Sequence, residues 1–152
     1  ADHNDERDRR AAPRAARGPA LNNLYLDASA ITKLVIAEAE SSQLRERVRN
    51  QVLITSRVAV VEVGKAVARA NPTADPQPVV NRLAFVELTA DLARLAATTG
   101  GPALRALDAI HLASALQLGG EIDAFLTYDA RQADAARSLG LRVETPERET
   151  PD

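Results

Sequence analysis

The sequence contains no cysteine in its 152 residues, which excludes disulfide bonds and thiolate metal sites. Aromatic residues make up only 3% of it, so contact with a nucleic acid would depend on arginine and phosphate rather than on base stacking. No apolar run approaches the roughly 18 residues that cross a membrane. These absences predict a protein of a reducing compartment, the cytoplasm, with no membrane partner.

The charges of the chain are nearly balanced. Lysine and arginine number 19 and aspartate and glutamate 21, which gives a net charge of −2. Bulk charge therefore gives no indication of nucleic-acid binding. The hydrophobic fraction of 45% and the charged fraction of 26% are typical of one globular domain. We place that domain at 21–146, between a polar tail at 1–20 and a second tail at 147–152. The first tail is predicted to be disordered, and a basic arm that touches nucleic acid is the alternative.

Strand and helix patterns alternate along the domain. Strands are predicted at 24–26, 52–55, 84–88, 124–127 and 141–144. Helices are predicted at 29–37, 40–50, 57–70, 75–83, 90–98, 107–118 and 129–139, the first with Ser29 as its N-cap. The first strand lacks polar alternation, as do strands that are covered on both faces. The pattern predicts a three-layer α/β/α fold around a parallel sheet of four to five strands.

Two aspartates come directly after apolar strands. Asp27 follows the strand at 24–26, and Asp129 comes just after the strand at 124–127. Ligands of open α/β sheets bind at the carboxyl ends of the strands, so both positions are candidates for a functional site. Each aspartate also precedes a helix, and a plain helix cap is the alternative for both.

Two more acids lie on helices that are otherwise apolar. Glu62 shares helical spacing with Lys65 and Arg69, so a solvated polar stripe is the alternative for this residue. Asp108 and His111 belong to a polar seam that either faces solvent or lines a cleft. For His111 alone, a hydrogen-bonded structural histidine is favoured over a catalytic base.

Four carboxylates gathered at one sheet edge would repel one another. A pair about 4 Å apart costs on the order of 4 kcal/mol at an effective dielectric constant of about 20. Such a cluster holds protons or binds a cation. Since neither cysteine nor a histidine pair accompanies the acids, their oxygen ligands suit Mg²⁺ or Mn²⁺ and do not suit structural zinc. A hard dication among acidic residues is an apparatus for phosphodiester hydrolysis.

Four segments of the chain resemble PIN-domain ribonucleases, and most closely the VapC-type toxins of bacterial toxin–antitoxin pairs. They are LYLDASA at 24–30, VVEV at 60–63, LRALDAIHLA at 104–113 and LTYD at 126–129. The resemblance implies a parallel α/β/α fold and a divalent-metal-dependent endoribonuclease that cleaves RNA to inhibit translation. It also implies a cognate antitoxin protein that inhibits the enzyme, and a homodimer.

The resemblance extends to individual residues. It implies that the catalytic and metal-binding acids are Asp27, Glu62, Asp108 and Asp129. Ser29 and Thr127 match the small hydroxyl residues that lie beside such a site in the family. Candidates to hold the RNA backbone are Lys65, Arg69 and Arg105. An alternative from another class is a non-catalytic PIN-like module that only docks a partner protein.

Overall fold

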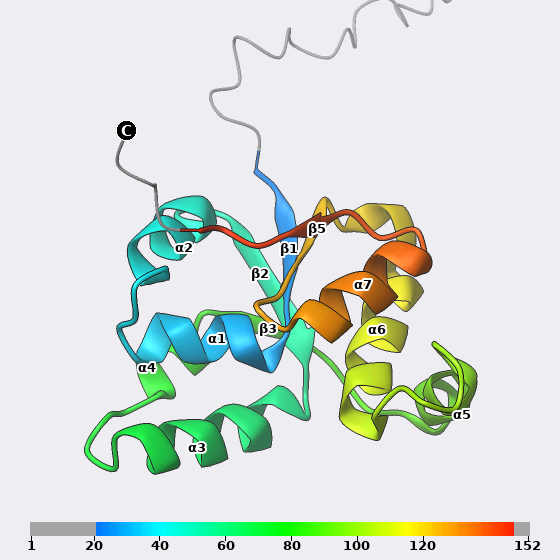
Figure 1. Ribbon diagram of the computed structural model, residues 1–152, viewed down its shortest axis with the longest axis horizontal. Helices are drawn as coiled ribbons and strands as arrows, with labels where there is room; N and C mark the ends of the chain where they lie inside the picture. The colour runs from blue at the N-terminus through cyan, green and yellow to red at the C-terminus, as the bar shows by residue number, and fades with distance from the viewer. Residues whose placement is uncertain (1–20, 148–152) are drawn as a thin grey trace, which may run out of the picture.

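The computed structural model describes residues 21–147, which form a five-stranded parallel sheet between layers of helices (Figure 1). Across the sheet the strands are β3 (Leu83–Val86), β2 (Val52–Ser56), β1 (Asn23–Leu26), β4 (Ala124–Leu126) and β5 (Val143–Glu144). All four neighbouring pairs are parallel, which confirms the predicted sheet.

Successive side chains of the central strand point to opposite layers. Leu24 and Leu26 pack in one core with helices α1, α2 and α3, whereas Tyr25 packs in a second core with α6 and α7. The ring of Tyr25 stacks on Phe125 of the neighbouring strand, with 5.2 Å between ring centroids. Because both faces of β1 are covered, its uninterrupted apolar sequence is explained.

The helices connect the strands in the predicted alternation. They are α1 (Ala28–Val35), α2 (Ser41–Val48), α3 (Ala59–Ala70), α4 (Gln77–Val80), α5 (Ala90–Thr98), α6 (Ala106–Leu118) and α7 (Ala130–Ser138). Helix α5 packs on the outer side of α6 through Leu92, Ala96 and Ala113. The three-layer α/β/α prediction is confirmed.

The segment between α3 and β3 differs most from prediction. The helix predicted at 75–83 is only the single turn α4, and the strand predicted at 84–88 begins earlier, at Leu83. Leu83 pairs with Leu53 of β2 and packs against the core under α1 and α3. The helix therefore ends before Leu83, although the local pattern is helical, because this leucine pairs with β2 and packs against the core.

The two predicted tails, 1–20 and 147–152, lie outside the described residues except for Glu147, so their state stays a prediction. Among the helices of residues 21–147, none has both the length and the apolar character needed to span a membrane.

Candidate active site

Asp27 lies at the carboxyl end of β1 and is the N-cap of α1. Its Oδ1 accepts hydrogen bonds from the backbone N–H of Ala30 (3.1 Å) and from Ser29 Oγ (2.6 Å), and its Oδ2 accepts one from Thr127 Oγ1. The residue is only 5% exposed. Burial raises the pKa of the Asp27 carboxyl, although these hydrogen bonds oppose the shift. The prediction that Ser29 caps α1 is wrong, because Ser29 lies within the first turn and donates to the true cap.

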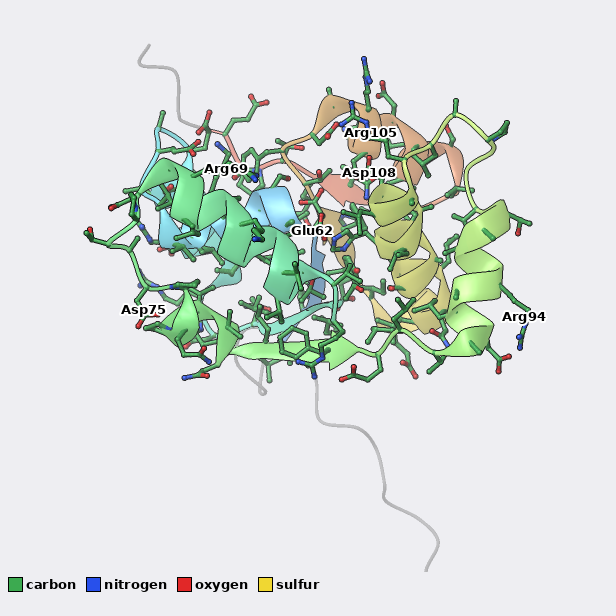
Figure 2. The ribbon with its side chains drawn as sticks, turned by 90° about the horizontal axis from the view of Figure 1, so that it is seen from below. Glu62, Arg69, Asp75, Arg94, Arg105 and Asp108 are labelled. Atoms are coloured by element: carbon green, nitrogen blue, oxygen red, sulfur yellow. The ribbon has the colours of Figure 1, made fainter. Side chains whose placement is uncertain are left out.

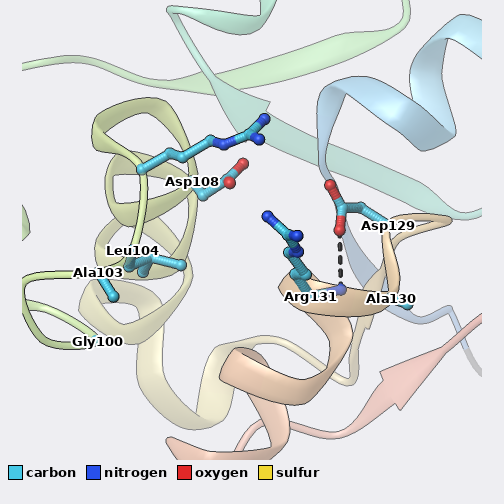
Figure 3. Close-up of a pocket in the computed structure, with 8 residues that line it drawn as sticks. Gly100, Ala103, Leu104, Asp108, Asp129, Ala130 and Arg131 are labelled. Carbon is cyan, nitrogen blue, oxygen red and sulfur yellow. Dashed lines mark hydrogen bonds between the residues drawn. The ribbon is translucent and has the colours of Figure 1, made fainter.

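Asp129 lies on the same edge of the sheet, because β1 and β4 are parallel neighbours. It caps α7, with Oδ1 accepting from the backbone N–H of Arg131 (2.9 Å, Figure 3) and from that of Gln132 (3.2 Å). Thr127 joins the two acids, since its Oγ1 donates to Asp27 and accepts from the N–H of Asp129 at 3.1 Å. The helix-cap interpretation is therefore confirmed for both aspartates. Capping uses only Oδ1 of Asp129, which leaves its second carboxylate oxygen available to a ligand.

Asp108 and Glu62 approach this edge from two helices. Asp108 lies in the first turn of α6, and Glu62 lies in the first turn of α3. Figure 2 shows both side chains directed to the space between these helices. Burial raises the pKa of Asp108, and the charges of Asp129, Asp27 and Glu62 raise it further. Asp108 therefore lies within electrostatic range of the other three predicted acids.

His111 accounts for the placement of Glu62. Its Nε2 lies 2.7 Å from Glu62 Oε1, and its Nδ1 lies 2.8 Å from the hydroxyl of Tyr25. His111 is thus a buried, hydrogen-bonded histidine, as predicted. The solvated stripe considered for Glu62 with Lys65 and Arg69 is wrong for Glu62, whose side chain is only 20% exposed. The sequence gives no local signal for this contact between α3 and α6.

A cavity of about 450 Å³ lies beside the acids, between α6 and α7. Asp108 and Asp129 line it together with Arg105 and Arg131, and Figure 3 shows Arg131 reaching between the two aspartates. Arg131 is a candidate RNA contact that the sequence did not lead us to predict, although its position two residues after Asp129 indicates that it lies near this acid. Of the other predicted RNA contacts, Lys65 and Arg69 follow Glu62 along α3 and line a separate cavity of about 520 Å³.

The donor set suits a hard divalent ion that keeps part of its water shell. All four acids offer carboxylate oxygens, and the repulsion that raises the pKa of Asp108 is one that a cation relieves. Within residues 21–147, no three His, Asp or Glu side chains stand close enough to enclose an ion by themselves. An ion bound here would contact fewer than three of these side chains directly and would keep several of its own waters, as Mg²⁺ usually does.

Comparison with known proteins identifies the family. The model of the PIN domain family matches residues 24–138. The chain belongs to the PIN domain family. This PIN domain is 37% identical over 131 residues to the ribonuclease VapC47 of Mycobacterium tuberculosis, covering 81% of the chain and 96% of the relative. It is 39% identical over 127 residues to the ribonuclease VapC46 of the same species, covering 81% and 97%.

Solved structures show the same fold. The PIN domain matches the crystal structure of M. tuberculosis VapC20, described as a sarcin-ricin-loop-cleaving toxin, with a TM-score of 0.60 and 16% identity over 78% of this chain and 95% of that one. It matches a chain of Rickettsia felis VapBC2, solved with a DNA fragment from its promoter, with a TM-score of 0.58 and 12% identity over 81% and 98%. At such identities the likeness concerns the fold alone.

Proposed function

We propose that this PIN domain is a divalent-metal-dependent endoribonuclease, the toxin of a toxin–antitoxin pair, which cleaves RNA in the cytoplasm and so inhibits translation. Two observations support the proposal. Asp27 and Asp129 follow the paired strands β1 and β4, and Asp108 lies within electrostatic range of both and of Glu62. The names of the curated relatives, which are ribonucleases of the VapC type, support it.

Each of the four acids has its own role in the proposed reaction. Asp27, Asp108 and Asp129 would hold one Mg²⁺ or Mn²⁺, directly or through water, and Glu62 would complete the site or orient the attacking water. A divalent ion held there supplies an activated water and neutralises charge that develops on the phosphate. Ser29 and Thr127 hold the Asp27 carboxylate in one orientation through their hydroxyl groups.

Positive side chains near the acids would hold the RNA backbone. Arg105 and Arg131 line the cavity that also contains Asp108 and Asp129, so a phosphate there would meet two guanidinium groups. Lys65 and Arg69 lie farther along α3 and would contact neighbouring phosphates. Because aromatic residues are scarce, base stacking contributes little to this binding.

An antitoxin protein is the second partner, and its docking area lies beside Glu62. Val61 and Leu107 are 64% and 45% exposed, and with Val58 they give the cavity at α3 an apolar wall. An antitoxin segment with apolar side chains would bury this wall and cover the acids at the same time. The homodimer stays a prediction, which light scattering of the purified chain tests directly.

The decisive experiment measures cleavage of a single-stranded RNA by the purified full chain, with Mn²⁺ or with a chelator. We expect cleavage only with Mn²⁺, and its loss in Asp108→Asn. Asp91→Asn is the matched control, because Asp91 is an exposed acid on α5 whose carboxylate pairs with Arg94. Undiminished cleavage by Asp108→Asn would contradict the proposal.

Thermal unfolding separates the nuclease from the alternative of a protein-binding module. A ligand at 100 times its dissociation constant adds about 2.7 kcal/mol to the free energy of unfolding. We therefore expect millimolar Mn²⁺ to raise the melting temperature of the wild type and not of Asp108→Asn. Absence of both the shift and cleavage would favour the binding module.

A further inference from the structure

A chain of hydrogen bonds runs from the centre of the sheet to the Glu62 carboxylate. The Tyr25 hydroxyl lies 2.8 Å from His111 Nδ1, and His111 Nε2 lies 2.7 Å from Glu62 Oε1. Tyr25 and His111 are 0% and 1% exposed, whereas the Glu62 side chain is 20% exposed. The chain therefore begins in the core and ends at the border of the acidic site.

A neutral His111 ring satisfies all three groups with one order of donors and acceptors. An ionised carboxylate only accepts, so His111 Nε2 carries the hydrogen in its bond to Glu62. In the neutral ring, Nδ1 then accepts the hydrogen of the Tyr25 hydroxyl. The rings of Tyr25 and His111 also meet edge to face, with centroids 5.8 Å apart. Both nitrogens are thus satisfied in one ring orientation, which directs Nε2 at Glu62.

This chain of bonds also ties together two helices that pack on different partners. Helix α3 packs mainly on α1, whereas α6 packs on α5 and β2. His111 follows Asp108 by three residues, so both lie on the same side of α6. The bond from His111 to Glu62 therefore fixes one acid relative to another that lies on a different helix.

We propose that Tyr25 and His111 are positioning residues, which hold the Glu62 carboxylate at the acidic cluster so that it contributes to binding a divalent ion. Without this bond, Glu62 would sample several rotamers at the surface of α3, because its neighbours Val61 and Lys65 are exposed. The inference rests on the proposed nuclease function and assigns a role to two residues outside the acidic set.

A double-mutant cycle tests the inference with the purified full chain. The variants are His111→Leu, Glu62→Gln and the double variant, with His111→Gln as the conservative replacement whose amide N–H still reaches a carboxylate. Calorimetry measures the dissociation constant of Mn²⁺ alone, and kinetics on a single-stranded RNA separate kcat from KM. Circular dichroism and thermal unfolding establish that each variant is folded.

We expect His111→Leu to weaken Mn²⁺ binding and to lower kcat by about 10- to 100-fold, with KM for RNA changed little. His111→Gln should recover most of both losses. In the Glu62→Gln background, His111→Leu should have almost no further effect, because the group that it positions is already altered. If His111 only stabilised the fold, His111→Leu would instead lower Mn²⁺ affinity and kcat by the same factor in both backgrounds.

Equal losses in both backgrounds, or unchanged Mn²⁺ affinity and kcat in folded His111→Leu, would overturn the inference. If Asp108→Asn abolishes cleavage while either result is obtained, the nuclease proposal stands and only the positioning role fails. Should His111→Leu not fold, Tyr25→Phe replaces it in the cycle, since it removes one hydroxyl from a buried ring. Tyr128→Phe is its matched control, because the Tyr128 hydroxyl donates to the Pro146 carbonyl instead.

Discussion

At the scale of the residue, Asp27 holds the first turn of α1 and also carries a buried charge. Its carboxylate accepts three hydrogen bonds, yet burial still raises its pKa. Because the folded state raises this pKa, it binds a proton more readily than the unfolded chain. Ionised Asp27 therefore lowers the free energy of unfolding at neutral pH. A site that needs this charge is less stable than one without it.

Asp27→Asn should make the protein more stable and inactive. The amide keeps an oxygen to accept from Ser29 and Ala30, its NH2 group would donate to Thr127 Oγ1, and the buried charge disappears. We expect a higher melting temperature at neutral pH and loss of metal-dependent cleavage by roughly 10²-fold or more. Calorimetry and RNA cleavage on the same preparation measure both. A variant that melts lower than the wild type would contradict this account of Asp27.

The raised pKa of Asp108 predicts how Mn²⁺ binding depends on pH. Its causes are burial first and then the charges of Asp129, Asp27 and Glu62. The cation competes with protons for these oxygens, so its affinity is low when Asp108 is protonated and rises as the pH passes the raised pKa. The stabilisation by Mn²⁺ should therefore grow with pH, starting above the ordinary Asp value of about 3.9. Melting curves at several pH values, with Mn²⁺ and with chelator, measure it. A shift of constant size across this range would contradict the coupling.

At the scale of the element, the turn from β4 into α7 supplies much of the site within a few residues. Thr127 bonds Asp27, Asp129 caps the helix, and Arg131 enters the cavity. Gln132 is buried, and its Nε2 donates to the backbone oxygen of Asp108 at 3.3 Å. This bond ties α7 to α6, so the two walls of the cavity are held at a fixed separation.

Arg131→Ala should weaken RNA binding without removing the metal site. Loss of one phosphate contact on a single strand reduces the slope of log affinity against log salt by about 0.7. We expect a raised KM, a smaller salt slope and unchanged Mn²⁺ affinity. Arg137→Ala is the control, because Arg137 also lies on α7 but pairs with Asp134 at the surface. Identical salt slopes for the two variants would exclude a phosphate contact by Arg131.

At the scale of the whole molecule, an exposed apolar area adjoins the acidic site. Val61 on α3 and Leu107 on α6 are both largely exposed, and Glu62 lies next to them. An antitoxin that covers this area would block access of RNA to the acids, so inhibition and recognition would share one surface.

Val61→Asp should prevent capture of the antitoxin. A buried, unpaired charge at the centre of an interface costs at least about 2 kcal/mol, which is roughly 30-fold in the dissociation constant. Co-expression with a candidate antitoxin and purification of the tagged PIN domain measure the loss. Leu95→Asp serves as the control, because Leu95 is similarly exposed at 42% but lies on α5. Equal retention of the antitoxin by both variants would exclude this docking area.

The sequence predicted the layers, the parallel sheet and the placement of Asp27 and Asp129, because each depends on a local pattern. An apolar strand followed by an acid and a helix places that acid at the carboxyl end of a strand, whatever the rest of the chain does. Local patterns failed where distant partners decide the outcome. Leu83 has a helical sequence pattern but lies in a strand, where it pairs with Leu53. The N-cap of α1 is Asp27 and not the predicted Ser29.

The contact of Glu62 with His111 shows the same limit at the site. The two residues are 49 positions apart, and neither helix carries a signal for the other. Helical spacing placed Glu62 with Lys65 and Arg69, since those are its neighbours in the chain. The roles of the four acids in binding metal and cleaving RNA stay predictions, which the variants above test.

The hydrogen bond between Thr127 and Asp27 joins residues that are 100 positions apart in the chain. At synthesis rates of about 5–20 residues per second, Asp27 leaves the peptidyl-transferase centre roughly 5–20 s before its partner is made. During that interval β1 has no β4 beside it, and the acidic site is incomplete. The cluster of acids that we propose to cleave RNA therefore cannot form on a growing chain until β4 has been made and has paired with β1.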